Sequence, residues 1–422
     1  MRRNLTEGGV FKNVLLFSLP YLLSYFLQTL YGMADLFIVG QFEGVASTTA
    51  VSIGSQVMHM LTVMIVGLAM GSTVSIGQAV GGGREKQAAR SIGNTATLFM
   101  SLSVLLMAGL LLLRPIVRVM STPEAAVSGA EAYLTICFIG IPFITAYNII
   151  SFIFRGLGDS KSPMYFIAVA CTVNIALDYL FMGALHLGSA GAALGTTLSQ
   201  AVSVAVSLIV IRKRNIGVPV ALQDGLIQVA FIVITIIANQ RGLTDAAAVG
   251  IVEKVISFLF LVPSSMLSTV SALGAQNIGA GKPERAVRTL GYACLLAAGF
   301  GLTVAAALQF VAEGIVGLFT TDSGAIAAGG QYLRGYIWDC LFAGLHFSFS
   351  GYFCACGKSG LSFLHNIIAI ALVRVPGVYL TSRLFPETLL PMGLATAAGS
   401  LLSVVICVVA FAALRRREAA HG

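Results

Sequence analysis

Two aspartates, Asp35 and Asp178, interrupt apolar runs that are otherwise long enough to cross a lipid bilayer. A carboxylate near the centre of a membrane costs roughly 2.5–3.5 kcal/mol, so each one needs a reason to be there. Gln28 and Tyr31 precede Asp35 by seven and four residues, which places all three on one helical face. Asn174 precedes Asp178 by four residues in the same way. These spacings are typical of polar groups that face the interior of a helical bundle.

Thr196 is predicted to lie at the same depth in the membrane as the two aspartates. At ~1.5 Å of rise per residue, Asp35, Asp178 and Thr196 fall at similar depths in the outer halves of their apolar runs. Two carboxylates in a site of low dielectric constant cannot both be ionised cheaply unless a cation lies between them. The set therefore suits a group that takes up and releases H⁺ or Na⁺. The alternative is that each acid is bound to a nearby hydroxyl or amide and only joins helices together.

The composition of the chain is that of a membrane protein. Of 422 residues, 57% are hydrophobic and 10% are charged, with a mean hydropathy of +0.91, whereas soluble domains carry about 25% charged residues. Apolar runs of about 20 residues can cross a hydrocarbon layer of ~30 Å as helices. We predict an all-α integral membrane protein with twelve transmembrane spans, near 14–39, 47–79, 91–113, 132–154, 162–185, 191–211, 218–239, 246–275, 289–312, 332–356, 360–382 and 391–413.

The basic residues predict the orientation. With a cytoplasmic N-terminus, 18 of the 25 Lys and Arg residues fall in inner segments, 5 in outer segments and 2 within spans. This bias follows the positive-inside rule, so both termini are predicted to be cytoplasmic. It also explains the net charge of +8 without a nucleic-acid partner. The partners expected are membrane lipids and small molecules.

The chain contains an internal repeat. A shift of 198 positions brings the block 78–84 onto the block 276–282, and a shift of 199 brings Gly158 and Ser160 onto Gly357 and Ser359. Six spans per half give a parallel repeat, which implies two pseudo-symmetric six-helix lobes around a central cavity. We predict an N-terminal lobe at 1–211, a short cytoplasmic link at 212–217 and a C-terminal lobe at 218–422.

The second half carries fewer clues to chemistry. Asp224 and Gln228 share a helical face and are candidates for a substrate cavity. Asp339 and Arg374 also lie inside predicted spans, and a cavity role and a structural pairing both stay open for them. The sequence contains no nucleophile elbow and no H-E-x-x-H zinc motif. We therefore expect no enzyme and no cofactor.

The segment from Leu19-Pro20 to Asp35-Leu-Phe-Ile-Val-Gly40, the sequence Arg155-Gly-Leu-Gly-Asp159-Ser and the duplicated blocks resemble the multidrug and toxic compound extrusion (MATE) family, most closely its DinF-like bacterial branch. The resemblance implies two lobes around a cavity and antiport of organic, often cationic, compounds against Na⁺ or H⁺. It implies that the cation site, including a possible Na⁺ at Asp35 and Asp178, is formed by Asp35, Asn174, Asp178 and Thr196. It also implies that Pro20 bends the first helix. At a position where the family usually has an amide the chain has Ser151, and Asn148 lies one turn earlier.

Together these observations predict a cation-coupled antiporter that exports small organic compounds by alternating access and acts as a monomer in the bacterial inner (plasma) membrane. The predicted substrate cavity comprises Gln28, Tyr31, Asn148, Ser151, Asp224 and Gln228. These candidates are acidic or neutral, which favours cationic substrates. Two alternatives are a flippase of lipid-linked cell-envelope precursors and a passive channel.

Overall fold

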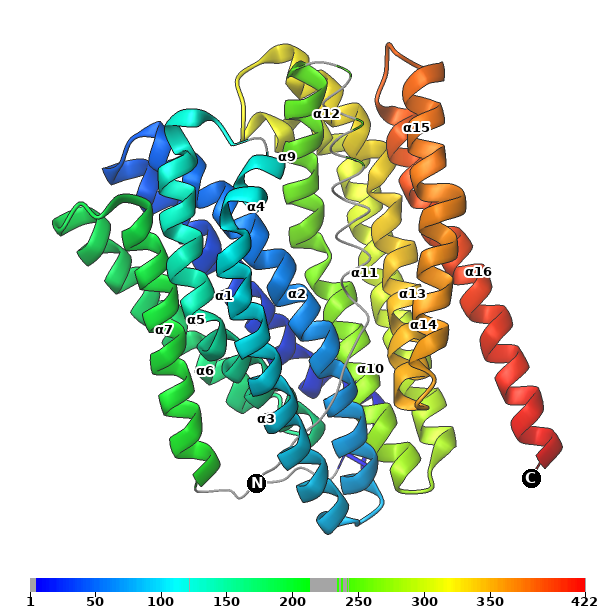
Figure 1. Cartoon of the computed structure of the whole chain (residues 1–422). Helices are drawn as coiled ribbons and strands as arrows, with labels where there is room; N and C mark the ends of the chain where they lie inside the picture. The colour runs from blue at the N-terminus through cyan, green and yellow to red at the C-terminus, as the bar shows by residue number, and fades with distance from the viewer. Residues whose placement is uncertain are drawn as a thin grey trace. The chain divides into compact units, whose positions relative to one another are not determined.

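The computed structural model describes residues 5–120, 122–212, 234, 237, 241 and 243–421. Within these ranges the chain is α-helical and contains no strand (Figure 1). Ten of the described helices or helical stretches are long and apolar enough to cross a membrane. The predicted span near 218–239 lies almost entirely outside the described residues. The all-α membrane fold expected from the sequence is confirmed.

Large apolar side chains on the outside of the helices fit a lipid environment. Leu111 and Phe310 are 86% and 87% exposed, and many other leucine, valine and phenylalanine side chains also point outward. Serines and threonines lie inside instead, as Ser72, Thr73 and Ser268 do with no exposed surface. A bilayer favours this distribution because lipid chains solvate apolar groups and leave polar groups unsatisfied.

The chain divides into two compact units. Unit 1 contains Leu19–Asp224, and unit 2 contains Leu5–Ser18 together with Gly225–Gly422. Helix α1 (Val10–Phe42) is therefore shared, with its first turns in unit 2 and the rest in unit 1. The predicted link at 212–217 lies outside the described residues except for Arg212, so the predicted lobe boundaries stay a prediction.

Unit 1 is built around helix α5 (Glu124–Gly156), most of which is buried. It packs against α2, α3 and α7, so that apolar residues of α1, α2, α5 and α7 form the core. The elements that follow α1 in this unit are α2 (Val45–Gly81), α3 (Glu85–Met107), η1 (Ala108–Leu112), α4 (Leu113–Val119), α5, α6 (Lys161–Asp178), η2 (Tyr179–Ala184) and α7 (Gly188–Arg212).

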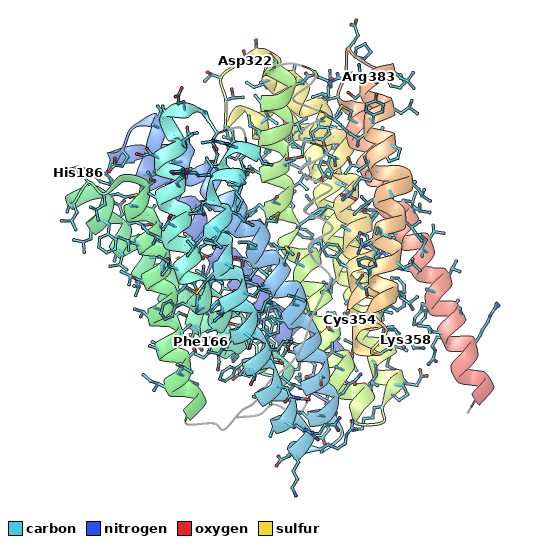
Figure 2. All side chains as sticks on the ribbon, in the orientation of Figure 1. Phe166, His186, Asp322, Cys354, Lys358 and Arg383 are labelled. Carbon is cyan, nitrogen blue, oxygen red and sulfur yellow. The ribbon has the colours of Figure 1, made fainter. Side chains whose placement is uncertain are left out.

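Unit 2 is built around helix α13 (Trp338–Ala355), which packs against α10, α11 and α16. Within this unit Asp322 and Arg383 lie at one end of the bundle and Lys358 lies toward the other (Figure 2). The predicted span near 332–356 is divided between α12 and α13, with the break at Ile337. The described elements are α9 (Leu243–Leu259), α10 (Leu261–Gly279), α11 (Pro283–Gly317), α12 (Ser323–Tyr336), α13, α14 (Ser359–Ala369), η3 (Ile370–Arg374), α15 (Val375–Leu384) and α16 (Leu390–His421).

The predicted repeat is visible in the backbone. Gly83 and Gly281 end α2 and α10 with φ values of 68° and 70°. The amide of Arg84 donates to the carbonyl of Ala79 at 2.8 Å, and the amide of Lys282 donates to that of Asn277 at the same distance. Each turn thus closes with the same hydrogen bond, 198 positions apart. Glycine tolerates these left-handed conformations because it has no Cβ.

Candidate functional site

The structure brings the four predicted cation-site residues together inside unit 1. Asp35 lies on α1, Asn174 and Asp178 lie on α6, and Thr196 lies on α7. The Thr196 hydroxyl donates to Asp35 Oδ2 at 3.1 Å, and the side chains of Asp178 and Asn174 lie within interaction range of the same carboxylate. Asp35, Asn174 and Asp178 are 5%, 1% and 0% exposed. The first helix of the unit therefore meets two consecutive later helices, α6 and α7, at a pair of buried carboxylates.

The two carboxylates lie apart from any basic side chain that the structure describes. Among the described residues neither Asp35 nor Asp178 forms an ion pair with a basic side chain. In the same part of the chain, no hydrogen bond is formed by Asp35 Oδ1, by either Asp178 oxygen or by either polar atom of the Asn174 amide. Burying an ionised carboxylate is costly unless a proton or a cation balances it. The site therefore has the electrostatic character of a place that binds a cation.

The donor atoms suit a proton or a hard metal ion. The carboxylates of Asp35 and Asp178 lie close to the Thr196 hydroxyl and the Asn174 amide, and hard cations prefer oxygen ligands. The described residues contain no group of three or more His, Cys, Asp or Glu side chains that could hold a metal ion. A cation here would therefore be bound by few charges, which suits an ion that is exchanged rather than held permanently.

Gly195 creates the space for Asp178, although no sequence pattern distinguishes it from the other glycines of the chain. A Cβ at this position on α7 would collide with the Asp178 carboxylate and would lie 3.5 Å from the amide nitrogen of Asn174. Helix α6 also changes to the π-helical segment η2 immediately after Asp178. Such segments are frequent at functional sites because they alter which side chains face the interior.

The predicted cavity residues of unit 1 fall into two places. Tyr31 lies near Asp35 and interacts with the side chain of Gln200, a residue that the sequence analysis missed. Gln28, Asn148 and Ser151 line a small cavity between α1, α2 and α5, whose other lining residues are Ser24, Tyr25, Val66, Tyr147, Phe152 and Arg155. We call it the Arg155 cavity. Its lining includes the basic residue Arg155, which the sequence did not indicate as a cavity residue, beside the predicted neutral residues.

Two predicted cavity residues cannot be placed, whereas Pro20, the predicted bend, can be located within a helix. Asp224 and Gln228 lie outside the described residues. Pro20 lies inside α1, two residues after the point at which the helix passes from unit 2 to unit 1. The Ser24 hydroxyl donates to the Pro20 carbonyl at 2.8 Å. Proline removes one hydrogen bond of the helix, so α1 is weakened at this point.

The buried acid of unit 2 is arranged differently. Asp339 on α13 forms an ion pair with Arg374, and the Arg374 guanidinium also donates to the Ser400 hydroxyl at 3.2 Å. Asp339 is fully buried and the Arg374 side chain is 8% exposed. Of the two roles left open by the sequence, the structure shows the pairing. Asp339 thus carries its own positive partner, whereas Asp35 and Asp178 have none in the described part of the chain.

The duplicated helical fold defines a polytopic membrane transporter. The family model MatE matches residues 20–180 and 219–380, so the chain belongs to the MATE family. Two relatives from Bacillus subtilis, named probable multidrug resistance proteins YpnP and YoeA, are each 28% identical, over 88% of both chains for YpnP and over 90% of this chain and 88% of the relative for YoeA. A solved MATE structure in complex with MaL6 is 22% identical, with a TM-score of 0.88 over 99% of this chain and 98% of its own. The predicted twelve-helix, two-lobe architecture is the fold of this family.

Proposed function

We propose that this chain exports small organic compounds across the bacterial plasma membrane in exchange for a cation, H⁺ or Na⁺, that binds between Asp35 and Asp178. The observation that carries the proposal is the pair of buried carboxylates without a basic partner among the described residues. The names of the two relatives from Bacillus subtilis support compounds of the drug class as cargo.

The geometry supports separate roles for the neutral side chains and for the bound cation. Thr196 donates directly to Asp35 and so orients this carboxylate, and the Asn174 amide lies beside it. The bound cation balances the buried charge, and its release leaves an arrangement that is unfavourable in a dry interior. We infer that this difference in the cost of the buried charge couples cation binding to the side of the membrane toward which the site opens. Release of the cation toward the cytoplasm then returns the transporter to the state that accepts a compound.

The energy available from one ion is sufficient for a useful gradient. One charge that crosses a potential of 100 mV supplies about 2.3 kcal/mol. This corresponds to about fiftyfold in concentration. One or two ions per uncharged compound therefore sustain efflux against a few tenfold steps of concentration, and export of a compound with one positive charge needs one ion more.

The test is efflux of an organic cation from proteoliposomes, with a pH gradient and a Na⁺ gradient imposed separately. We expect one of the two gradients to drive accumulation against concentration in the wild type. Asp35→Asn and Asp178→Asn should abolish the gradient-driven part, because an amide cannot bind the exchanged cation as a carboxylate does.

Asp322→Asn is the matched control. Asp322 is exposed and caps α12 by accepting a hydrogen bond from Ala325, and asparagine caps helices equally well. The control should transport like the wild type. Unchanged gradient-driven transport in both Asp35→Asn and Asp178→Asn would reject the proposed roles.

The same vesicles separate the two alternatives. A passive channel would equilibrate the compound without accumulating it, whatever gradient is imposed. A flippase of lipid-linked precursors would bind a lipid diphosphate and not the organic cation. The proposal predicts accumulation of the organic cation only while the coupling gradient lasts.

A further inference from the structure

Arg155 is a buried cation in unit 1 whose role the cation site does not explain. It lies at the last turn of α5 and is only 5% exposed. Its guanidinium carbon is 3.8 Å from the ring centre of Tyr21 and 4.9 Å from that of Phe152. The Tyr25 ring lies further away, at 5.8 Å. Three aromatic rings thus surround a positive charge in the interior of the unit.

No acid within the described ranges neutralises this charge. Among the described residues Arg155 forms no ion pair, and its Nε makes no hydrogen bond. The nearest acid in the sequence, Asp159, caps α6 by accepting from the amides of Lys161 and Ser162 at 3.0 Å. Aromatic faces attract a guanidinium, but they offer it no hydrogen-bond acceptor in its own plane. A buried cation in this condition has unused donors.

The internal repeat shows that the turn after α5 does not need an arginine. The amide of Gly158 donates to the carbonyl of Arg155 at 3.0 Å, and the amide of Gly357 donates to that of Cys354 at 2.8 Å. Gly158 and Gly357 have φ values of 85° and 71°. The same turn therefore forms in unit 2 around a cysteine. The guanidinium of Arg155 must serve something other than the backbone.

The space beside Arg155 is small and polar. The Arg155 cavity includes the amides of Gln28 and Asn148 and the hydroxyl of Ser24 in its lining. One Asn148 N–H already donates to the Ile144 carbonyl at 2.8 Å, which fixes the orientation of this side chain. Neutral amide and hydroxyl donors around a guanidinium are the surroundings in which a carboxylate or phosphate group is bound.

The cavity is separate from the cation site. Tyr25 of the cavity and Asp35 of the cation site are ten residues apart on the same helix, or about 15 Å along its axis. Arg155 therefore does not act as a counter-charge for Asp35. The two sites carry opposite charge at different depths of one unit.

We propose that the Arg155 cavity binds the carboxylate of a transported compound, so that the substrates include molecules with an acidic group. This rests on the proposed export function, which it refines by naming a substrate class. A guanidinium presents two parallel N–H groups that match the two oxygens of a carboxylate. The rings of Tyr21 and Phe152 hold the guanidinium in place for this contact. Gln28 and Asn148 add neutral donors at the edge of the cavity.

The test is equilibrium binding to the purified full-length protein in nanodiscs of phosphatidylcholine, without any ion gradient. The probes are two aromatic amines that share one scaffold and differ only in a free carboxyl group or its methyl ester. We expect the wild type to bind the free acid about tenfold more tightly than the ester, since hydrogen bonds to charged groups are strong when water is excluded. Arg155→Gln should bind both probes with equal affinity.

Two further variants keep the result interpretable. Arg155→Lys retains the charge but not the paired N–H groups, so it should keep only part of the preference. Arg383→Gln is the control, because Arg383 also lies over a tyrosine ring, that of Tyr379 at 5.5 Å, but is exposed. It should bind like the wild type. If Arg155→Gln does not fold, the comparison of acid with ester in the wild type and in Arg155→Lys decides the question.

Two results would overturn the proposal: equal affinity of the wild type for acid and ester, or a preference that persists in Arg155→Gln. A third would assign the cavity to a lipid headgroup instead, namely loss of the preference when phosphatidylglycerol is added to the nanodiscs. Asp35→Asn should keep the preference for the acid. Failure of ion coupling and failure of the anion site are therefore measured separately.

Discussion

Replacement of Gly195 by alanine tests whether the packing of α7 against α6 sets the cation site. Gly195 is buried, and an added Cβ would collide with the carboxylate of Asp178. It would also lie 3.5 Å from the amide nitrogen of Asn174. Because Asp178 is completely buried, its carboxylate has no exposed direction in which to move away. We expect Gly195→Ala to displace Asp178 from Asp35.

The stability change is a balance of two effects. Overpacking of a buried site costs about 1–3 kcal/mol. Alanine gains about 1 kcal/mol over glycine in a helix. The net effect of Gly195→Ala on the free energy of unfolding is therefore a loss of about 0–2 kcal/mol. Gradient-driven efflux should fall far more than this small change in stability can explain, because the carboxylates of Asp35 and Asp178 no longer lie together.

Gly93→Ala is the matched control on α3 of the same unit. Gly93 is exposed, and a Cβ there would meet no atom within 4 Å. This variant should gain up to about 1 kcal/mol in stability from helix propensity and should transport normally. Thermal unfolding in detergent, followed by circular dichroism, and gradient-driven efflux from proteoliposomes measure the two properties. The reasoning fails if Gly195→Ala is stabilised like Gly93→Ala and keeps wild-type ion-driven efflux.

Two further predictions concern hydrogen bonds and charge pairs. Thr196→Val removes the donor to Asp35 and should weaken cation binding about tenfold in a direct binding titration, whereas Thr172→Val, at an exposed site on α6, should have no effect. In unit 2, Asp339→Asn and Arg374→Met should each lower the free energy of unfolding by about 3–5 kcal/mol, because each leaves a buried charge without its partner. The double variant should lose far less than the sum of the two, and additive losses in unfolding measurements would contradict the pairing.

The sequence was sufficient for the fold and for the four polar residues of the cation site to be identified as candidates. These residues, Asp35, Asn174, Asp178 and Thr196, stand out because a polar side chain in an apolar span is costly. Helical spacing then places residues of one span on the same face, and depth places residues of different spans at a similar level. The structure places them together, although their role in ion coupling stays a prediction. The repeat was also visible, since its turns depend on glycines at fixed positions.

Other features depend on contacts that no local pattern encodes. Gly195 matters through the absence of a side chain, which leaves no mark in hydropathy. The pair Asp339–Arg374 joins residues 35 positions apart, and no pattern in either segment indicates that these two residues pair. The assignment of Leu5–Ser18 to unit 2 is likewise a result of packing, because α1, which begins at Val10 within this segment, continues without interruption into unit 1.

The most direct test of the central claim is to measure cation release when an organic substrate binds to the purified protein in nanodiscs. The experiment records proton release in weakly buffered solution and Na⁺ release in a parallel sample. The account predicts that substrate displaces one of these cations from the wild type and none from Asp35→Asn or Asp178→Asn. Cation release of wild-type size from both variants would contradict it, because the ion would then be bound elsewhere in the molecule.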